Sequence, residues 1–539
     1  MIKSALLVYF TLALVNAIPN IIMVLVDDWG FSDLSSDIRN ETIFESHAKT
    51  PVIKSMINEG RILERHYTAS WCAPSRISFQ SGRLPLNVVR KEFYDRTGNL
   101  NWLAINSTDP NGYNGIPLKM TSVAKKMKAA GYRTHYSGKW GAGFATVQHS
   151  PVGQGYDTQF GYLQSGNNYY TETLDPRYIE QPSGCELAYT DFLLTDLCAN
   201  NVPATDRNNT IWEDYLIMDH TMKTIRNHDS KEPLFLMHAF HSLHTPLNPP
   251  EELQHVVDVK NKARRHYLGM LKFVDTSLGK IRNLLQEKEM WENTLLVVSS
   301  DNGGPIYPSA KKTKDRYSLF GGASNFPLRG GKVSDFEGGI RTTAFVTGGL
   351  VPEEVRGRPM YDYVHISDWY STFAHLAGVS AFDDVAHKAG LPPVDGVNQW
   401  NQIAGASKLP ARTEMHISSS TLIQDNWKLI RASSESTATS FNKYGVGWGL
   451  SSYFGIHGRD CLTGCLFDIL KDPFEKMDKS RKYERVTANL IERLDHLNQH
   501  HFKNNVNQTM LDACNFLKDN NQGFYGPFWD PIRGQMAIL

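Results

Sequence analysis

Short apolar runs alternate with helical patterns over roughly the first 380 residues of the chain. Three of these runs are unbroken and rich in β-branched or aromatic residues, and they predict buried strands at 20–26 (NIIMVLV), 234–240 (LFLMHAF) and 294–300 (TLLVVSS). Strands that alternate with helices are typical of α/β proteins. We therefore expect a large mixed, mostly parallel sheet sandwiched by helices.

The helices between these strands carry start and stop signals. Thr50 and Gly60 bracket the pattern TPVIKSMINEG, and Thr121 and Gly131 bracket TSVAKKMKAAGY. Residues 260–291 predict one or two longer helices.

The pattern changes beyond about residue 400. The segments WKLIRASS and CLFDILKDPFEK, followed by a helical stretch over 483–505, predict a smaller α+β unit made of an antiparallel sheet and a helix. We expect a leader at 1–17, a large α/β domain at 18–410 and the smaller C-terminal domain at 411–539.

Composition narrows the classes of function. The chain has 539 residues, 41% of them hydrophobic, and its 56 Lys+Arg balance 56 Asp+Glu, so its formal net charge is zero. That length supports a large core and more than one domain. Without a basic run or a net positive charge, we expect no nucleic-acid partner.

The N-terminus is typical of a secretory signal peptide. One lysine and an apolar run precede Ala17, after which we expect cleavage. Four Asn-x-Ser/Thr sequons agree with the secretory pathway and are candidate glycosylation sites: Asn40, Asn106, Asn208 and Asn507. No later run reaches the roughly 18 apolar residues of a membrane span. We expect a protein that is either secreted or lysosomal.

Six cysteines are few for a secreted chain of this length, so disulfides would be local staples. Cys185 and Cys198 bracket a polar loop and are candidates for a pair. The pairing of the late cysteines stays open: Cys461, Cys465 and Cys514. If Cys72 is reserved for chemistry, five cysteines remain, and at least one is then free or paired outside the chain.

Polar residues follow the predicted strands. Asp27 and Asp28 come after the first strand, and Asp301 and Asn302 come after the third. Ligands in open α/β sheets bind beyond the carboxyl ends of the strands, and this oxygen-rich set suits Ca²⁺ or Mg²⁺. The alternative is that Asp-Asp and Asp-Asn-Gly-Gly are only turns.

Three histidines follow or end the second strand. The spacing of His238, His241 and His244 suits neither a strand face nor a helical turn, so a zinc site is not expected. His244 lies just before Thr-Pro on the loop and is the best placed to reach a site.

Two lysines lie among glycines. Lys139 occurs in YSGKWGAG and Lys332 in FPLRGGKVSDFEGGIR. Both are either solvated loop residues or ammonium groups that converge on an anionic substrate, which glycines would allow to approach closely.

Cys72 precedes a predicted helix, PSRISFQSG, with Gly82 as its stop. A helix N-terminus favours an anion, and Arg76 would stabilise a thiolate at this position. The alternative is a buried or disulfide-bonded cysteine.

Taken together, these segments resemble a known family. The run from Cys72 to Arg76 (CAPSR), followed by Ser81-Gly82-Arg83, is similar to the C-x-P-S-R…[TS]-G-R signature of type I sulfatases, members of the alkaline-phosphatase superfamily. VDDWGFSDL, GKW, SLHTPLNPPEEL, SSDNGG and LFDILKDPFEK also resemble family segments in the family order, so the likeness runs from about residue 20 to the end. The His244 segment, GYLQSGNNYY and GFYGPFWD resemble the arylsulfatase B-like branch.

The resemblance implies a set of site residues. In that family the cysteine is oxidised in the endoplasmic reticulum by the formylglycine-generating enzyme, which makes residue 72 a formylglycine. One Ca²⁺ would be held by residue 72 together with Asp27, Asp28, Asp301 and Asn302. The sulfate would be surrounded by Arg76, Lys139, His244, Lys332 and, as a further substrate contact, Ser165.

The implied activity is hydrolysis of sulfate esters of sulfated sugars, glycosaminoglycans or aryl alcohols. A hydroxyl of the hydrated aldehyde would attack sulfur while Lys139 and Lys332 neutralise the sulfonyl oxygens. His244 or Lys332 would protonate the leaving oxygen. The second hydroxyl would then expel sulfate and restore the aldehyde.

One position departs from the family pattern. Where the family has G-K-W-H-x-G, this chain has GKWGAG, with Gly141 in place of a histidine that is thought to help release sulfate. Water or His149 would have to substitute, and loss of a general base typically costs about 10²- to 10⁴-fold. This departure leaves open an impaired sulfatase-fold protein that binds sulfated glycans. The metal site expected at the strand ends also leaves open a phosphatase or phosphodiesterase of the wider superfamily, which shares that plan.

Overall fold

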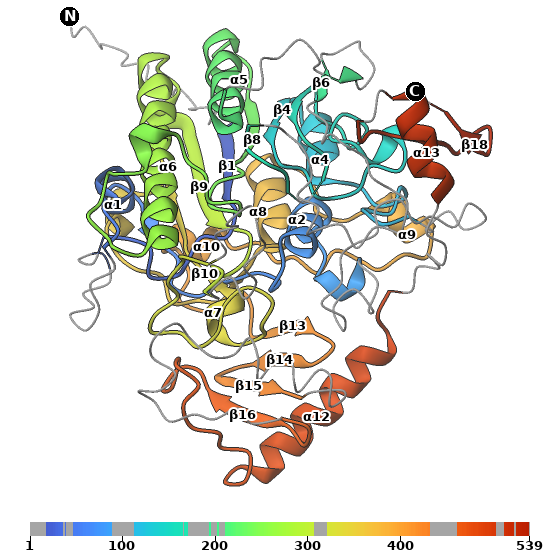
Figure 1. The fold of residues 1–539 in the computed structure, drawn as a ribbon. Coiled ribbons are helices and arrows are strands. Elements are labelled where there is room, and N and C mark those ends of the chain that lie inside the picture. Colours follow the sequence, from blue (N-terminus) through green and yellow to red (C-terminus); the bar gives the residue numbers. More distant parts are fainter. Residues whose placement is uncertain are drawn as a thin grey trace, which may run out of the picture.

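The computed structural model describes residues 18–35, 38, 47–88, 113–164, 166–170, 193–195, 202–203, 211–306, 321–431, 461–502, 511–521 and 524–537. Within these residues a nine-stranded sheet forms the centre of the molecule (Figure 1). Its strands in spatial order are β2 (Arg61–Ile62), β11 (Ala344–Thr347), β9 (Thr294–Ser300), β1 (Asn20–Val26), β8 (Leu234–Ala239), β4 (Arg133–Gly138), β5 (Thr158–Gly161), β6 (Leu193–Thr195) and β7 (Val202–Pro203).

The middle of this sheet is parallel and its edges are antiparallel. β1 pairs in parallel with β8 and β9, and β4 pairs in parallel with β8 and β5. β11, β2, β6 and β7 join in antiparallel register. The three predicted strands are present as β1, β8 and β9, and the expected mixed, mostly parallel sheet is confirmed.

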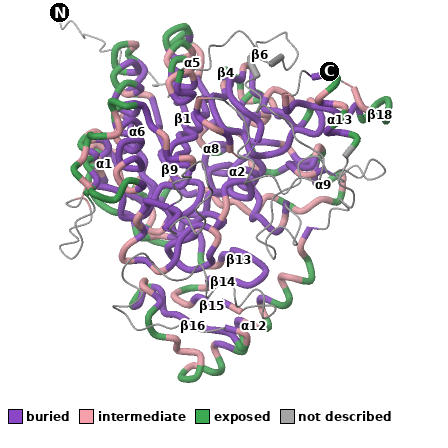
Figure 2. The backbone as a smooth tube through the Cα atoms, in the orientation of Figure 1, coloured by how far each residue is buried: buried purple, intermediate pink, exposed green. Residues whose placement is uncertain are grey.

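Helices cover both faces of the sheet. Alternate residues of β1 enter two separate cores: Met23 packs with Ile77 and Phe373, whereas Val24 packs with Ile53 and Leu271. The first core lies under α2 (Cys72–Ser81), α4 (Val123–Ala129) and α8 (Asp368–Leu376), and the second lies under α1 (Pro51–Asn58), α5 (Glu213–Asn227) and α6 (Lys262–Glu287). Figure 2 shows the strands between these layers as buried.

Short elements connect the layers. A three-stranded sheet contains β10 (Arg341–Thr342), β3 (His66–Tyr67) and β12 (Val364–His365), and α7 (Glu337–Ile340), α9 (Asp384–Lys388) and α10 (Trp400–Ile403) are short helices. Short 3-10 turns occur at Pro85–Asn87, Val147–His149, Glu251–Leu253, Trp291–Asn293 and Glu353–Val355.

The smaller C-terminal unit is an antiparallel sheet with one helix, as predicted. Its elements are β13 (Glu414–Ser418), β14 (Thr421–Gln424), β15 (Trp427–Ile430), β16 (Cys465–Asp468) and α12 (Glu484–Gln499). On one face of the sheet, Leu429 packs against Leu490 of α12. On the other face, Ile430 shares a core with Tyr67 and Phe336 of the large unit.

After the small sheet the chain returns to the large one. The returning elements are α13 (Leu511–Asn520), β17 (Trp529–Asp530) and β18 (Gln535–Met536). Leu517 and Phe528 are buried in the same core as Ile77, and the backbone N–H of Phe528 donates to the Ala145 carbonyl at 3.1 Å. Figure 1 places α13 and β18 far from β13–β16.

Two details of the helices differ from expectation. Ser122, and not Thr121, caps α4, because its hydroxyl accepts from the Lys125 N–H at 3.1 Å. Thr50 does precede α1, but its hydroxyl accepts from the Ser35 N–H instead of capping the helix. Residues 260–291 contain a single long helix, α6.

The late cysteines are oxidised. Cys461 and Cys465 form a disulfide, and Cys514 is also in a disulfide. Several predicted features lie outside the described residues: the signal peptide at 1–17, Ser165, Cys185, Cys198, and the sequon residues Asn40, Asn106, Asn208 and Asn507. In the described part of the chain, no helix has the length and apolar character that crossing a membrane requires.

Candidate active site

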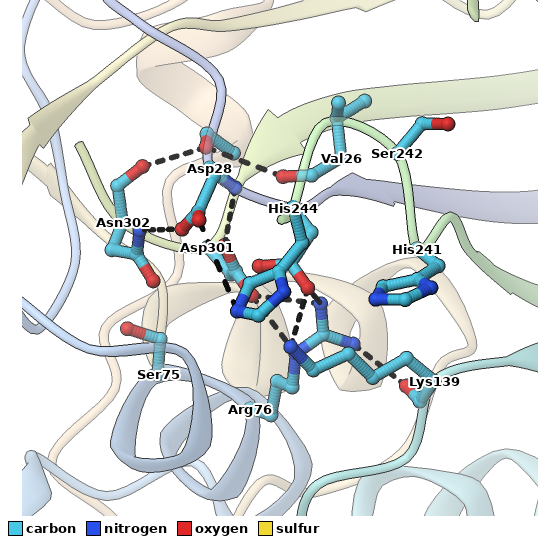
Figure 3. Close-up of polar contacts among 12 residues, drawn as sticks. Val26, Asp28, Ser75, Arg76, Lys139, His241, Ser242, His244, Asp301 and Asn302 are labelled. Atoms are coloured by element: carbon cyan, nitrogen blue, oxygen red, sulfur yellow. Dashed lines mark hydrogen bonds and ion pairs between the residues drawn. The ribbon is translucent and has the colours of Figure 1, made fainter. Parts of the chain in front are cut away.

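The polar residues that follow the central strands meet at one edge of the sheet (Figure 3). β1 leads into Asp27 and Asp28, β9 into Asp301 and Asn302, and β4 into Lys139. These strands run in parallel, so their carboxyl ends lie side by side. The structure therefore brings the predicted oxygen-rich set together.

The carboxylates of this set form compact groups with Cys72 and His244. Ligand atoms of Asp27, Cys72 and Asp301 all lie within 4.8 Å of one another, and so do those of Asp27, Asp28 and His244. Asp27 Oδ1 and Asn302 Oδ1 are buried and have no hydrogen-bond partner among the described residues. A buried acceptor without a partner costs about 1–3 kcal/mol, so the arrangement fits a hard divalent cation that takes oxygen ligands.

Three basic side chains pair with the three carboxylates. Lys139 Nζ contacts Asp27, Lys332 Nζ lies 2.6 Å from Asp28 Oδ1, and Arg76 Nη2 lies 2.7 Å from Asp301 Oδ2. We call these six residues the site cluster. Its three positive and three negative charges cancel, so a divalent cation and a dianionic ligand could be added together without leaving net charge.

Cys72 begins α2, and Arg76 lies one helical turn further on. Cys72 is the first helical residue and not, as expected, the residue before the helix; it is buried and in no disulfide. The disulfide alternative is therefore excluded. Arg76 also donates through Nη1 to the Lys139 carbonyl at 2.6 Å, which fixes its guanidinium beneath the carboxylates.

The pKa values of the carboxyl groups reflect a crowded acidic site. Burial, together with the nearby Asp27 and Asp301, raises the pKa of Asp28 to about 6 against the opposing effect of Lys332. Burial and Asp27 also raise the pKa of Asp301. The pKa of Asp27 is lowered, because Lys139 and Arg76 outweigh its burial. A cation bound beside these three carboxyl groups would lower the pKa of each of them.

His244 lies against the acidic group from the loop after β8. Its Nδ1 is 2.7 Å from the Thr245 carbonyl oxygen and its Nε2 is 4.0 Å from Asp28 Oδ2. Burial, Lys332 and Lys139 hold its pKa well below the usual range. A Cβ on Gly166 would lie 2.9 Å from the ring, so only glycine permits this approach.

Sequence reasoning missed the residues that support this loop. Asp214 accepts from the backbone N–H groups of His241 at 3.1 Å and Ser242 at 2.9 Å, and Glu213 contacts His241 Nδ1. The hydroxyl of Tyr169 lies 2.9 Å from the carbonyl oxygens of His241 and His244. Glu213 and Asp214 begin α5, so in the sequence they look like ordinary acidic residues of a first helical turn.

The other histidines are structural or lie elsewhere. His238 Nδ1 bonds Thr221 Oγ1 at 2.7 Å and its ring packs on Phe240. His149 Nδ1 bonds Thr146 Oγ1 at 2.8 Å; burial, with Lys125, lowers its pKa to about 3. None of these contacts connects His149 to the site cluster.

Gly141 faces Arg76. Its φ is +60°, and a Cβ there would lie 3.1 Å from Arg76 Cδ. A side chain at position 141 would therefore enter the site cluster directly. The position at which this chain has glycine instead of the family histidine therefore lies within the site.

Comparisons with known proteins agree with this geometry. The Sulfatase family model matches residues 19–379. Arylsulfatase J of Mus musculus is 29% identical over 511 residues, covering 89% of this chain and 76% of that protein. N-acetylgalactosamine-6-sulfatase of Rattus norvegicus is 27% identical over 403 residues, covering 74% of this chain and 66% of that protein. The solved structure of Ps i-CgsB in complex with k-i-k-neocarrahexaose superposes with a TM-score of 0.64 at 24% identity, covering 94% of this chain and 99% of that one.

The family model covers more than half of the chain, and this protein therefore belongs to the sulfatase family. The resemblance to type I sulfatases is confirmed, and so is the fold class, which the solved structure shares. Together with the two named relatives, the family match supports a sulfatase enzyme.

Proposed function

We propose that this protein hydrolyses sulfate esters of sulfated sugars or aryl alcohols, using one Ca²⁺ and a formylglycine made from Cys72. The observation that carries this proposal is the meeting of three kinds of group at one edge of the sheet. A cysteine begins a helix, two buried oxygens have no hydrogen-bond partner in the part of the chain that the structure describes, and three cations are paired with carboxylates. The family match supports the same reaction class.

The calcium ion would be held by Asp27, Asp28, Asp301 and Asn302, together with residue 72. The unpartnered oxygens of Asp27 and Asn302 support this set, since oxygen is the ligand that Ca²⁺ prefers. When bound, Ca²⁺ supplies a Lewis acid that lowers the pKa of a hydroxyl at residue 72.

As formylglycine, residue 72 supplies a hydrated aldehyde whose hydroxyl is the nucleophile. Its position at the start of α2 favours the ionised form of that group, because backbone N–H groups point toward it. The formylglycine-generating enzyme acts in the endoplasmic reticulum, so this proposal carries with it a secreted or lysosomal location. It also assigns the site to residues 18–410 and leaves 411–539 as the smaller domain.

The remaining residues would bind and orient the sulfate. Lys139 and Lys332 would neutralise the negative charge on its sulfonyl oxygens. Both ammonium groups lie at Asp27 and Asp28, beside the proposed cation site. Asp28 and its neighbours raise the pKa of Lys332 despite its burial, so it stays positively charged beside the sulfate. Lys332 or His244 would protonate the leaving oxygen. The negative charge of a sulfate ester would raise the pKa of His244, which can then donate from Nε2. Ser165 is proposed as a further substrate contact.

A sulfated sugar is the favoured class of substrate. One relative is named for the 6-sulfate of N-acetylgalactosamine, and the similar solved structure holds an oligosaccharide. The mammalian arylsulfatase supports aryl sulfates as convenient test substrates.

Gly141 supports a second candidate function, a sulfated-glycan-binding protein without turnover. No side chain at position 141 can take the proton that the family histidine is thought to take, although the rest of the site cluster is complete.

Mass spectrometry of the peptide that contains residue 72, combined with turnover of a small aryl sulfate, tests the proposal. We expect a mass loss that corresponds to formylglycine, and turnover well above that of a Cys72→Ala variant. Unmodified cysteine with no turnover above this control would refute the enzyme function. If that protein still bound sulfated glycans, the second candidate would be supported.

A further inference from the structure

The segment 329–337 carries Lys332 and lies between the site cluster and the C-terminal sheet. On the large unit, the Lys332 N–H donates to the Gly304 carbonyl at 3.2 Å and the Val333 N–H donates to the Ser70 carbonyl at 2.8 Å. Val333 has a φ of +71°, a conformation that β-branched residues rarely adopt. A backbone held in this state needs contacts that determine it.

The first of these contacts comes from the edge of the C-terminal sheet. Asp335 accepts from Thr421 Oγ1 at 2.8 Å and from Ser418 Oγ. All three side chains belong to buried residues. Two hydroxyl groups of β13 and β14 thus hold a carboxylate three residues after Lys332.

The second contact is a buried charged group that we call the anchor cluster: Glu337, Lys428 and Glu475. Lys428 Nζ lies 3.1 Å from Glu337 Oε1 and 2.7 Å from Glu475 Oε1. Glu475 Oε2 accepts from the Glu337 backbone N–H at 2.7 Å. All three side chains have 0% exposure, so solvent does not screen these interactions.

The anchor cluster also reaches the strand that leads to Cys72. Tyr67 OH donates to Glu337 Oε2 at 2.8 Å, and Tyr67 lies in β3, five residues before Cys72. Residues of the C-terminal unit therefore contact the segment that carries Lys332. Through Glu337 they are also linked to Tyr67, in the strand that precedes residue 72.

We propose that Thr421, Lys428 and Glu475 of the C-terminal unit are positioning residues that set the place of Lys332 for the reaction. The inference rests on the proposed function, since it takes Lys332 as a sulfate-binding residue. None of these three residues touches the site cluster. They act through Asp335 and Glu337 of the segment 329–337. A displacement of about 1 Å of a reacting group can cost about 10²-fold in rate, so loosening this segment should reduce catalysis in a folded protein.

Thr421→Val tests the inference without removing a charge. It deletes one hydrogen bond to Asp335 and keeps the β-branched shape. Thr487→Val is the matched control, because Thr487 lies in the same unit and its hydroxyl, among the described residues, donates only to the carbonyls of Ser480 and Tyr483. The double variant Lys428→Met with Glu475→Gln tests the anchor cluster while keeping its net charge.

We expect Thr421→Val to lower kcat/KM for an aryl sulfate by about 10-fold in the folded fraction, and the double variant to lower it more. Thr487→Val should match the wild type, even if all variants melt at lower temperature. Crystal structures should show Lys332 Nζ displaced from its 2.6 Å contact with Asp28 in Thr421→Val and in the double variant, but not in Thr487→Val. Wild-type kcat and KM with an unmoved Lys332 in both test variants would overturn the inference.

The structural readout separates this inference from the proposed function. If the wild-type protein shows no turnover above Cys72→Ala, the proposed enzyme function fails. The position of Lys332 in the Thr421→Val crystal then still decides whether the C-terminal unit holds the segment in place.

Discussion

The site cluster and the anchor cluster use the same chemistry for different ends. Both combine lysines with carboxylates in a buried setting, and residues 332 and 337 connect them. In the anchor cluster both carboxylate oxygens of Glu337 and Oε2 of Glu475 accept hydrogen bonds. Glu475 Oε1 has no hydrogen bond among the described residues, but it lies 2.7 Å from the ammonium group of Lys428. In the site cluster and its neighbour Asn302, two buried oxygens have no hydrogen-bond partner among the described residues. The comparison teaches that an oxygen with neither a donor nor a cation beside it, and not buried charge as such, distinguishes the cluster that can take a ligand from the cluster that holds a segment in place.

The sharpest test exchanges one carboxylate for an amide in each cluster. Asp301→Asn removes a charge that the cation and Arg76 both need, and we expect kcat/KM for an aryl sulfate to fall by about 10³-fold. Glu475→Gln should keep calcium affinity, because Glu475 has no contact with the oxygen-rich set. Calorimetric titration with Ca²⁺ and steady-state kinetics on both variants make the comparison. Equal loss of calcium binding in the two would break it.

Adding a base to the site cluster should have the next largest effect. Gly141→His places an imidazole beside Arg76, and we expect kcat to rise by about 10²-fold if the missing histidine limits release of sulfate. The positive φ and the 3.1 Å approach to Arg76 Cδ will cost stability. Gly141→Ala carries the same strain without the base, so its kcat serves as the reference. An unchanged kcat in Gly141→His would show that another group already performs this step.

Removing calcium should lower stability through the site cluster alone. A ligand that binds only the folded state at 100 times its Kd adds about 2.7 kcal/mol to the free energy of unfolding. We expect a chelator to lower the melting temperature of the wild-type protein by several degrees and to leave Asp301→Asn nearly unchanged. An equal shift in both proteins would place the bound cation elsewhere.

The anchor cluster should act on the pH dependence of stability. Burial raises the pKa of Glu475 to about 7, against the opposing effect of Lys428 and with support from the Glu337 charge. Because the folded state then binds a proton more tightly than the unfolded state, stability is greatest below the unfolded pKa and falls as pH rises from about 4.5 to about 7. The slope from one proton is at most about 1.4 kcal/mol per pH unit.

Urea unfolding of the wild type and of Glu475→Gln at several pH values measures this slope. We expect the fall in stability between these pH values to be smaller in the variant. The same slope in both proteins would mean that Glu475 is ionised throughout, with its charge compensated by Lys428.

The parts of the fold that sequence predicted are those set by local pattern. β1 and β9 have the predicted bounds, and α6 fills most of the predicted helical range, because a continuous apolar run or a helical repeat is a property of neighbours in the chain. The N-cap of α4 is not set by local pattern alone. Thr121 and Ser122 both suit the N-cap position, and the folded structure selects Ser122.

The site was predictable where residues follow parallel strands. Asp27 and Asp301 had to meet because β1 and β9 are neighbours. The Lys332–Asp28 contact joins residues 304 positions apart through an irregular segment, which no local pattern encodes. The same holds for Glu213 and Asp214, whose contacts with His241 and Ser242 depend on how α5 packs.

The return of the chain to the large sheet after α12 has a consequence for motion. The small sheet is joined to the large unit before β13 and again through α13, where Leu517 and Phe528 are buried in the large core. A module tethered at both ends keeps a high effective concentration near its partner, so each break of its contacts with segment 329–337 is followed by rapid rebinding. We expect the contacts between the small sheet and segment 329–337 to persist in the folded protein. Amide hydrogen exchange at Glu337 should then be as slow as in the strands of the large sheet.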